Sequence, residues 1–480
     1  MKRKYALWIE SGILLWLIFD YTFYSFRSID IQHILRVLIL VFISLIIFVT
    51  RDRSELNYGG QRLTITFLFL LGLVITCFQE YFRFVIGDLP DLSLGYELSS
   101  GIVDKSISLS SIGLTSFIIG ELWITKNRII NKPKRTYSTG LIQSLAVLFF
   151  VLFLAFTDAS YFRGGYSRIM NSGGIGIIPT YAQNFYQYCV IGAISLVTWN
   201  FKIVNQGEKL NFIKYIRLYK PLFVISIIIY CILIILSGDR GPLLRTALVF
   251  FIGYIIAANK IVNGKKLLLL LVGGVSIMFF LGALRLTDVS QGWGNRFNEA
   301  SGIIEGNESL LFSSTNELAV VIRAQHAIMM YVDQYGFVGF HALFYPIIGI
   351  VPGLGLLYET IFGIQQEKII SAYVATNYMG ADHGMGTTCL ADLYLSYGIV
   401  PVILFMFFLG MFLRNIEYRV FSGNSTLPGW VCFFALMGAA IGIGRASAIA
   451  PFRDILYILL FIFLTQTKTT SFKRTIEKTA

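Results

Sequence analysis

Long apolar stretches alternate with short polar ones along most of the chain. A helix needs about 20 predominantly apolar residues to cross a bilayer, and twelve stretches come close to that length and composition. The sequence therefore predicts an all-α polytopic integral membrane protein with about twelve transmembrane helices. The expected spans are 6–26, 31–49, 63–85, 106–124, 141–160, 181–200, 221–237, 243–258, 267–284, 388–413, 428–445 and 452–466.

A long interval between the ninth and tenth predicted spans interrupts this pattern. It holds three of the four histidines (His326, His341 and His383) and most of the uninterrupted polar sequence. We therefore divide the chain into three parts. These are nine N-terminal helices (1–284), one large late external loop (285–387), and three C-terminal helices with a cytoplasmic tail (388–480).

Two segments of this loop have patterns of their own. NELAVVIRAQHAIMMYV (316–332) has helical spacing of apolar and polar residues, which predicts a helix lying on the membrane. ALFYPIIGIVPGLGLLY (342–358) carries no charge but contains several prolines and glycines. It is too broken for a good spanning helix, so we expect it to dip into the outer leaflet or to bend at the interface.

The distribution of basic residues predicts the orientation. With a cytoplasmic N-terminus, the inside segments carry 25 of the 39 Lys and Arg residues, as the positive-inside rule requires. Both termini are then cytoplasmic. The start, MKRKYALWIESGILLW, is basic and then apolar, but no small-residue cleavage site follows, so we expect a retained signal-anchor helix. The inside segments are 1–5, 50–62, 125–140, 201–220, 259–266, 414–427 and 467–480.

Composition agrees with a membrane protein and excludes other classes. Only 14% of residues are charged and 56% are hydrophobic, whereas soluble domains have about 25% charged residues. The net charge of +12 fits basic cytoplasmic loops facing anionic lipid, so we expect no nucleic-acid partner. The five cysteines are scattered singly and have no metal-ligand spacing, so no metal site is predicted.

The remaining 14 basic residues are unusual in kind, because 12 of them are arginines. The inside segments instead contain 15 Lys and 10 Arg. A guanidinium binds phosphate or carboxylate oxygens through a planar fork, which favours an anion site on the outer side. The alternative is that arginine simply tolerates the headgroup region better by snorkelling.

SGDRGPLLR (237–245) joins two predicted helices on the outer side and places Arg240 and Arg245 near the headgroups. A charge inside a spanning helix is costly unless it faces a partner or a wet cavity, so we predict an anion clamp on a lipid phosphate. The alternative is a turn in which an Asp–Arg pair caps the helix. Arg285 ends the ninth span at the same surface, and Arg445 and Arg453 flank a later outside turn.

Two histidines are candidates for a general base. Arg323 and His326 are three residues apart on one helical face, although a lone histidine there is more often structural. Asp382 and His383 lie in a glycine-rich loop before the tenth span, where either group can deprotonate a sugar hydroxyl. The alternative for this loop is that Thr387 and Thr388 cap the next helix.

The sequence has no acidic pair with nucleotide-sugar metal spacing, and no Walker, Rossmann or GxSxG motif. We therefore expect a substrate that brings its own activation, with no cofactor.

The chain resembles the Wzy class of O-antigen and capsular repeat-unit polymerases, which are related to the O-antigen ligases. The resemblance rests on SGDRGPLL, on NELAVVIRAQHAIMMY followed by GIVPGLG, and on GADHGMGTTCLADLYLSYGIVP followed by FFLG. These short motifs occur in order over about 230–450, together with the twelve-helix plan and the late loop.

This resemblance implies a GT-C-like membrane glycosyltransferase of the bacterial cytoplasmic membrane. Such an enzyme transfers a growing glycan from undecaprenyl pyrophosphate onto the next lipid-linked repeat unit, without metal or nucleotide. Its partners would be this lipid-linked oligosaccharide, membrane lipid, and a flippase and chain-length regulator of the same pathway. The alternatives are an O-antigen ligase and a lipid-linked oligosaccharide flippase. The implied roles are His383, His326 and Asp382 in catalysis, and Arg240, Arg245, Arg285, Arg323, Arg445 and Arg453 on pyrophosphate or glycan.

Overall fold

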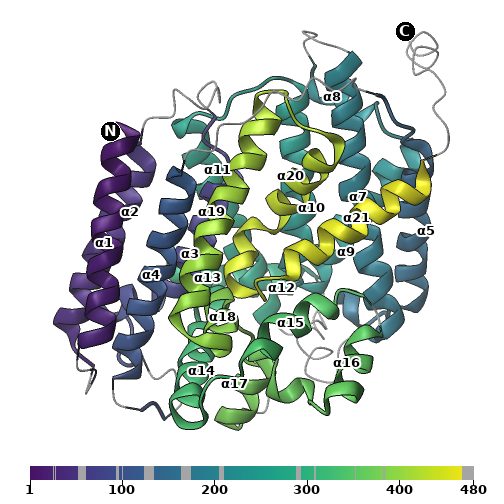
Figure 1. Cartoon of the computed structure of the whole chain (residues 1–480). Helices are drawn as coiled ribbons and strands as arrows, with labels where there is room; N and C mark the ends of the chain where they lie inside the picture. The colour runs from purple at the N-terminus through teal and green to yellow at the C-terminus, as the bar shows by residue number, and fades with distance from the viewer. Residues whose placement is uncertain are drawn as a thin grey trace.

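The computed structural model is a bundle of helices, and in the part of the chain that it describes no strand occurs. The long helices run side by side between two ends (Figure 1). The described residues are 1–24, 26, 29–51, 61–92, 97–99, 101–123, 135–163, 175–204, 210–287, 293–306, 310–351, 353–381 and 384–466, and within helices the side chains of 163, 285, 286, 293, 297, 303–306, 310, 311, 313 and 314 are not described.

The first half of the chain forms most of the long helices. They are α1 (Arg3–Phe23), α2 (Ile31–Thr50), α3 (Ile65–Val85), α4 (Ile102–Leu122), α5 (Gly140–Phe156), the short η2 (Tyr161–Arg163), α7 (Ile177–Val204), α8 (Phe212–Ile216), α9 (Pro221–Ser237), α10 (Arg240–Ala257) and α11 (Gly264–Leu286).

The second half begins with shorter helices and ends with long ones. They are α12 (Trp293–Gly306), α13 (Leu310–Ala319), α14 (Ile322–Tyr335), α15 (Phe340–Ile348), α16 (Leu354–Phe362), η3 (Gln366–Lys368), α17 (Ser371–Met379), α18 (Cys389–Tyr397), α19 (Ile399–Phe421), α20 (Leu427–Ala439), η4 (Ala440–Arg445) and α21 (Ala450–Thr465).

Nine helices in the described part of the chain are long and apolar enough to cross a membrane. They include α1–α4, α7, α10, α11, α19, and α20 continued by η4. The shorter apolar helices α5 and α9 and the C-terminal α21 lie at the remaining three predicted positions. An all-helical polytopic membrane protein is therefore confirmed, while the exact number of spans stays a prediction.

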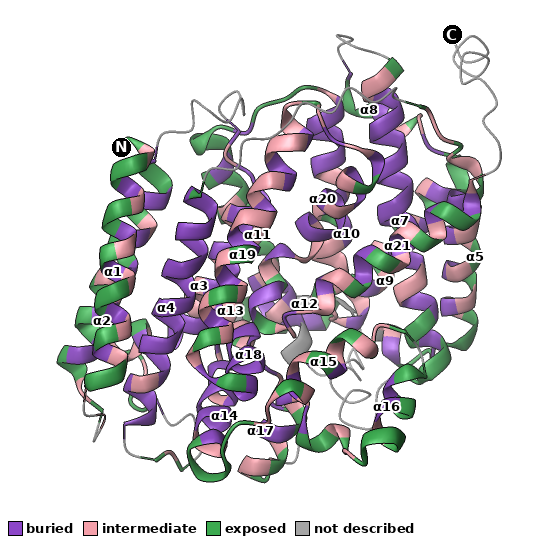
Figure 2. Cartoon of the chain, viewed as in Figure 1, coloured by how far each residue is buried: buried purple, intermediate pink, exposed green. Residues whose placement is uncertain are grey.

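Close backbone contacts hold the centre of the bundle, where Figure 2 shows α4 and α7 largely buried. A Cβ added at Gly120 of α4 would lie 1.9 Å from the carbonyl oxygen of Phe407, and one at Gly410 would lie 2.2 Å from that of Phe117. Only glycine fits at such distances, so α4 and α19 pack backbone to backbone, as small residues allow in membrane helix pairs.

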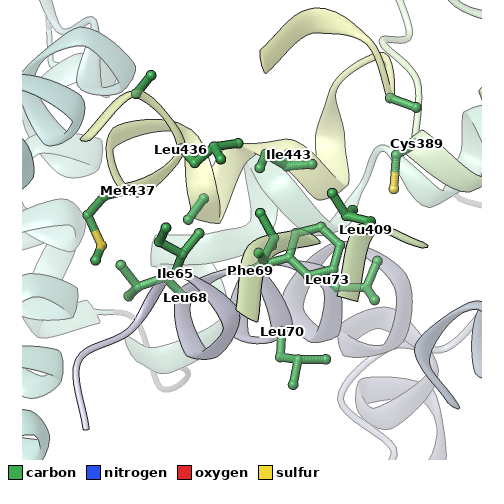
Figure 3. Close-up of a cluster of buried hydrophobic side chains, with 14 of the residues drawn as sticks. Ile65, Leu68, Phe69, Leu70, Leu73, Cys389, Leu409, Leu436, Met437 and Ile443 are labelled. Carbon is green, nitrogen blue, oxygen red and sulfur yellow. The ribbon is translucent and has the colours of Figure 1, made fainter. Parts of the chain in front are cut away.

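A second close contact joins α3 to η4. A Cβ at Gly72 would lie 2.1 Å from the carbonyl oxygen of Ile441. Around it, Phe69 and Leu73 of α3 are fully buried beside Leu436 and Ile443 (Figure 3). The C-terminal helices are thus fixed against the N-terminal half.

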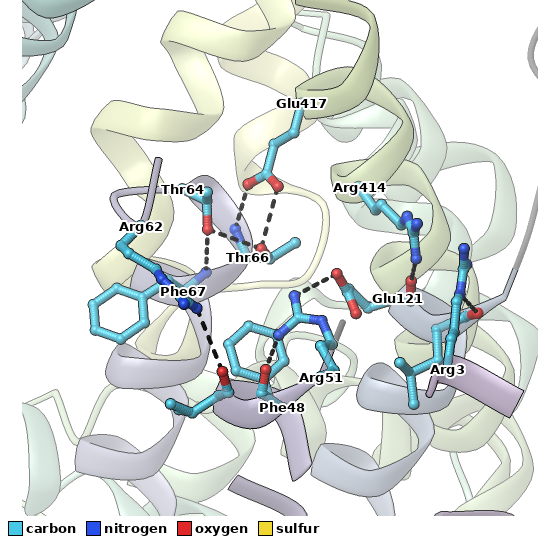
Figure 4. A network of polar contacts seen from close by, with 12 residues as sticks. Arg3, Phe48, Arg51, Arg62, Thr64, Thr66, Phe67, Glu121, Arg414 and Glu417 are labelled. Atoms are coloured by element: carbon cyan, nitrogen blue, oxygen red, sulfur yellow. Dashed lines mark hydrogen bonds and ion pairs between the residues drawn. The ribbon is translucent and has the colours of Figure 1, made fainter. Parts of the chain in front are cut away.

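Polar contacts tie the helices together at the end of the bundle where the chain starts. Arg51 and Glu121 form a buried ion pair at 2.5 Å, and Arg414 donates to the carbonyl oxygen of Glu121 (Figure 4). The backbone N–H of Thr66 donates to Glu417 at 2.7 Å. These residues belong to or border the segments predicted to be cytoplasmic.

The start of α1 and the end of α21 lie at this same end of the bundle. Arg3 donates to the carbonyl oxygen of Leu122 at 2.6 Å, and Gln466 donates to that of Ser138 at 3.3 Å. Leu122 precedes the predicted inside loop 125–140, and Ser138 lies near its end. The helices α14–α17 lie at the opposite end (Figure 1).

Two sequence expectations are wrong in detail. The predicted tenth span, 388–413, is broken at Gly398, whose φ of 73° ends α18 and starts α19, so the long apolar helix is Ile399–Phe421. The predicted helix 316–332 is also broken, between α13 and α14. Its second half is mostly buried in protein, because Gln325 donates to both Ser106 and Ser110 of α4 at 2.9 Å.

Candidate active site

The turn between α9 and α10 brings Arg240 to the end of the bundle opposite to the termini. Gly238 has a φ of 84° and caps α9, so α10 starts two residues later with Arg240 as its first residue. The guanidinium pairs with Glu317 of α13 and donates to the carbonyl oxygen of Met278 of α11 at 3.1 Å. Arg240 therefore joins three helices and is half-buried.

Arg245 lies further along α10 and belongs to a second group, which we call the Asp454 cluster (Arg245, Arg453, Asp454 and Tyr188). Arg245 lies 2.8 Å from Oδ2 of Asp454, and the Tyr188 hydroxyl donates to Oδ1 at 2.7 Å. Arg453 is exposed, with its Nε 3.6 Å from the same Oδ1. Two guanidinium groups thus share one carboxylate, which leaves a net positive charge of about one.

Arg445 lies at the other side of the turn that leads into α21. Its side chain is exposed, and the described residues place no carboxylate within salt-bridge distance of it. The turn itself is fixed from behind, because Ser447 Oγ donates to Asp392 at 2.9 Å and the Ala448 N–H donates to it at 3.3 Å. Arg445 and Arg453 are therefore presented from a held turn.

Asp392 is the centre of a network of hydroxyl groups, which we call the Asp392 network (Asp392, Ser371, Thr387 and Ser447). Ser371 of α17 donates to Asp392 Oδ1 at 3.0 Å and lies 2.7 Å from Thr387. Burial raises the pKa of the Asp392 carboxyl, and the hydrogen bonds that it accepts lower the pKa in part. The network connects α17, the end of the glycine-rich loop and the turn that carries Arg445.

The start of α14 contacts the same loop. Thr388, which caps α18 by accepting the Ala391 N–H at 3.0 Å, donates to Gln325 at 2.8 Å. A Cβ added at Gly386 would lie 3.5 Å from a methyl carbon of Val321, so these two residues are neighbours. Arg323 is half-buried in the first turn of α14. The predicted capping by Thr388 is confirmed, and the loop that contains His383 ends beside the segment that contains Arg323.

His326 lies in the interior and not at an open surface. Its side chain is fully buried, and Nε2 is 2.9 Å from the hydroxyl of Tyr81 in α3. Burial lowers its pKa to about 4, so the ring is neutral near pH 7. His326 therefore fixes α14 against α3 in this conformation.

The other predicted residues cannot be placed in full. Asp382 and His383 lie outside the described residues, and the side chain of Arg285 at the end of α11 is not described. Among the described residues, no group of three His, Cys, Asp or Glu side chains is arranged to hold a metal ion.

Two other arginines, Arg83 and Arg296, serve the fold. Arg296 is buried and donates to Thr287 at 2.9 Å, and Arg83 pairs with Glu80 at 3.1 Å and Asp88 at 2.6 Å. Arg83 also donates to Asn316 Oδ1 at 3.3 Å, so both guanidinium groups are used within the fold. Arg453 of the Asp454 cluster and Arg445 differ from Arg83 and Arg296, because their side chains are exposed.

Sequence reasoning missed the roles of several residues. Asp454 was visible as an acid in an apolar stretch next to Arg453, but its pairing with Arg245 joins positions 209 residues apart. Ser371, Ser447 and Gln325 carried no sequence signal, because hydroxyl and amide groups are common and only their tertiary partners give them a role.

The fold and this group of residues define a multi-pass helical membrane protein that has a cluster of arginines close to a buried carboxylate–hydroxyl network. A family model of the O-antigen polysaccharide polymerase Wzy matches residues 9–475, nearly the whole chain, so the chain belongs to this family. The resemblance inferred from the short motifs is confirmed. No curated protein and no solved structure matches the chain.

Proposed function

We propose that this protein joins oligosaccharide repeat units carried on undecaprenyl pyrophosphate into a surface polysaccharide, at the outer face of the bacterial cytoplasmic membrane. The observation that carries the proposal is the Asp454 cluster, in which Arg245 and Arg453 share one carboxylate. Arg445, which is also exposed, precedes the same helix in the sequence. A site with an excess of guanidinium over carboxylate suits a pyrophosphate.

The chemistry needs only groups that the chain can provide. The acceptor hydroxyl oxygen attacks the anomeric carbon of the growing glycan, and the bond from that carbon to the pyrophosphate oxygen breaks. Negative charge grows on the leaving pyrophosphate, where guanidinium groups stabilise it. The proton of the acceptor passes to a base, and direct attack inverts the anomeric centre. The pyrophosphate supplies the driving force, so neither a metal nor a nucleotide takes part.

We assign the base to His383, with Asp382 beside it to orient the imidazole. The glycine-rich loop that contains both ends in the Asp392 network, on the side of Arg445. His326 is the less favoured base, because it is fully buried against Tyr81. It acts as a positioning residue in this scheme.

The remaining arginines have supporting roles. Arg323 and Arg285 contact the glycan or its pyrophosphate from the large loop, which faces outward. Arg240 contributes to the local positive potential while its pair with Glu317 holds α13 in place. A flippase that delivers the units and a chain-length regulator act in the same pathway.

The test is a gel of surface polysaccharide from a deletion strain complemented with single variants. Arg245→Ala and Arg453→Ala are expected to lower polymerisation about tenfold or more, since a charge-assisted bond contributes about 1.5–3 kcal/mol. Arg453→Lys should restore only part of the ladder, because lysine keeps the charge but lacks the fork.

Arg217→Ala is the matched control, because Arg217 is also exposed but lies at the other end of the bundle. Normal ladders from both alanine variants at normal expression would contradict the clamp. In the uncomplemented strain, single repeat units outside indicate a polymerase. Units held inside would indicate a flippase instead, and long polymer left on its carrier would indicate a ligase.

A further inference from the structure

The pair of helices α15 and α16 has its polar groups turned inward and its apolar side chains turned outward. Tyr345 and Tyr358 are 9% and 5% exposed and pack against each other. Figure 2 shows α16 largely exposed at the end of the bundle. Nine large apolar side chains of the pair and of its connection are 37% to 67% exposed: Phe340, Phe344, Ile347, Val351, Leu354, Leu356, Leu357, Ile361 and Phe362.

The polar atoms inside the pair bond to one another. His341 Nδ1 lies 2.6 Å from the Tyr358 hydroxyl, and the Tyr345 hydroxyl donates to Glu359 at 2.6 Å. Internal satisfaction of polar groups beneath an apolar surface is what a segment in contact with hydrocarbon requires. A patch of this size is too apolar for a surface that only water covers.

The connection between α15 and α16 is fixed to α21. The Tyr457 hydroxyl donates to the carbonyl oxygen of Ile350 at 2.7 Å, and the Tyr457 ring stacks on Tyr188 with centroids 5.7 Å apart. Arg453 lies four residues before Tyr457, which places it on the same face of α21, one turn away. The connection between α15 and α16 is therefore next to the Asp454 cluster.

The apolar surface continues onto α21 itself. Leu456 and Leu460 are 51% and 44% exposed, so the helix presents hydrocarbon to its surroundings beside the turn that bears the cations. A ligand that covers both regions must have an anionic group at one end and a long apolar chain at the other.

We infer that α15 and α16 bind the isoprenoid chain of the lipid pyrophosphate whose phosphates lie on the Asp454 cluster. This inference rests on the proposed function and adds to it the part of the protein that selects a long-chain carrier. The apolar surface alone would suit any bilayer lipid. The cations one turn away favour a lipid with a pyrophosphate headgroup.

Photocrosslinking tests this directly in the purified full-length protein. A benzophenone amino acid replaces Val351, which is 46% exposed on the helix pair, or Leu35, which is 44% exposed on α2. Each protein is placed in vesicles of phosphatidylethanolamine and phosphatidylglycerol that contain labelled undecaprenyl pyrophosphate. Capture of the labelled carrier is compared with capture of phosphatidylglycerol.

At Val351 we expect a carrier-to-phosphatidylglycerol ratio about tenfold above that at Leu35. Adding Arg453→Ala should lower the ratio at Val351 to that at Leu35. In protein that keeps Arg453, equal ratios at Val351 and Leu35 would overturn the inference, because the helix pair would then contact only bulk lipid. Absence of lipid capture at Val351 would overturn it too, because the surface would face water.

The failure of this inference is distinguishable from failure of the proposed function. The wild-type protein is also expressed in the deletion strain, where it must restore the polysaccharide ladder. A restored ladder with equal crosslinking ratios refutes the chain-binding site alone. A deletion strain with a normal ladder refutes the polymerase itself.

Discussion

Removing the carboxylate of Asp392 should separate the held turn of Arg445 from the glycine-rich loop. In Asp392→Ala, Ser371 Oγ loses Oδ1 as its acceptor, and Ser447 Oγ and the Ala448 N–H lose Oδ2. These three hydrogen bonds are 2.9–3.3 Å long. Ser371 and Ala448 are buried, and each buried donor left unsatisfied costs about 1–3 kcal/mol. The expected destabilisation is therefore about 2–6 kcal/mol in total.

Activity per folded molecule should fall in addition to stability. A displacement of about 1 Å in a site can cost about a hundredfold in rate, and the network holds two segments of the site. We expect Asp392→Ala to lower the polymerisation rate about a hundredfold per folded molecule. Asp392→Asn keeps one acceptor oxygen and should therefore retain part of the polymerisation rate.

The assay measures polymer formed per folded molecule, with folded protein quantified by gel filtration in detergent. Glu417→Ala is the matched control, because it deletes a buried carboxylate that accepts the Thr66 N–H and hydroxyl at the other end of the bundle. If both variants lose activity only in proportion to folded protein, Asp392 has no positioning role. A fully active Asp392→Ala would refute the reasoning outright.

Three further predictions concern the fold. Gly120→Ala should destabilise the protein by about 2–3 kcal/mol, because its Cβ would meet the Phe407 carbonyl; Gly273→Ala, with open space around it, should not change the apparent Tm. Glu121→Ala should lower the free energy of unfolding by about 3–5 kcal/mol, because it leaves the buried Arg51 without its carboxylate. Comparing the Tm of this variant with that of Glu121→Gln checks the prediction. As the pH falls from 6.5 toward 4, stability should drop by up to about 3 kcal/mol, because His326 takes a proton only when unfolded; a His326→Gln variant with an unchanged pH slope of Tm would contradict this.

The apolar pattern predicted most of the helices because it reports directly on burial in protein or lipid. The long helices lie within a few residues of the predicted ranges, for example Ile65–Val85 for 63–85. The break at Gly398 was missed because a single glycine within an apolar run also occurs in unbroken membrane helices. Burial of α14 was missed because Gln325 and His326 look like surface residues until their partners in α3 and α4 are known.

The residue type of the candidate site was proposed from the sequence, but the arrangement of its residues was not. The excess of arginine over lysine on one side indicated guanidinium chemistry, and Arg245 and Arg453 were both named from it. Their common carboxylate, Asp454, depends on the packing of α10 against α7 and α21, which no spacing in the sequence encodes. Arg296 shows the limit of the composition argument, because its guanidinium is used within the fold.

Reconstitution tests the central claim most directly. The purified protein is placed in liposomes with undecaprenyl pyrophosphate-linked repeat units, in the presence of EDTA and without any nucleotide sugar. Our account predicts a ladder of lipid-linked polymers together with release of undecaprenyl pyrophosphate, and no ladder from Arg245→Ala combined with Arg453→Ala. Unchanged single repeat units with the wild-type protein, or an undiminished ladder with the double variant, would contradict it.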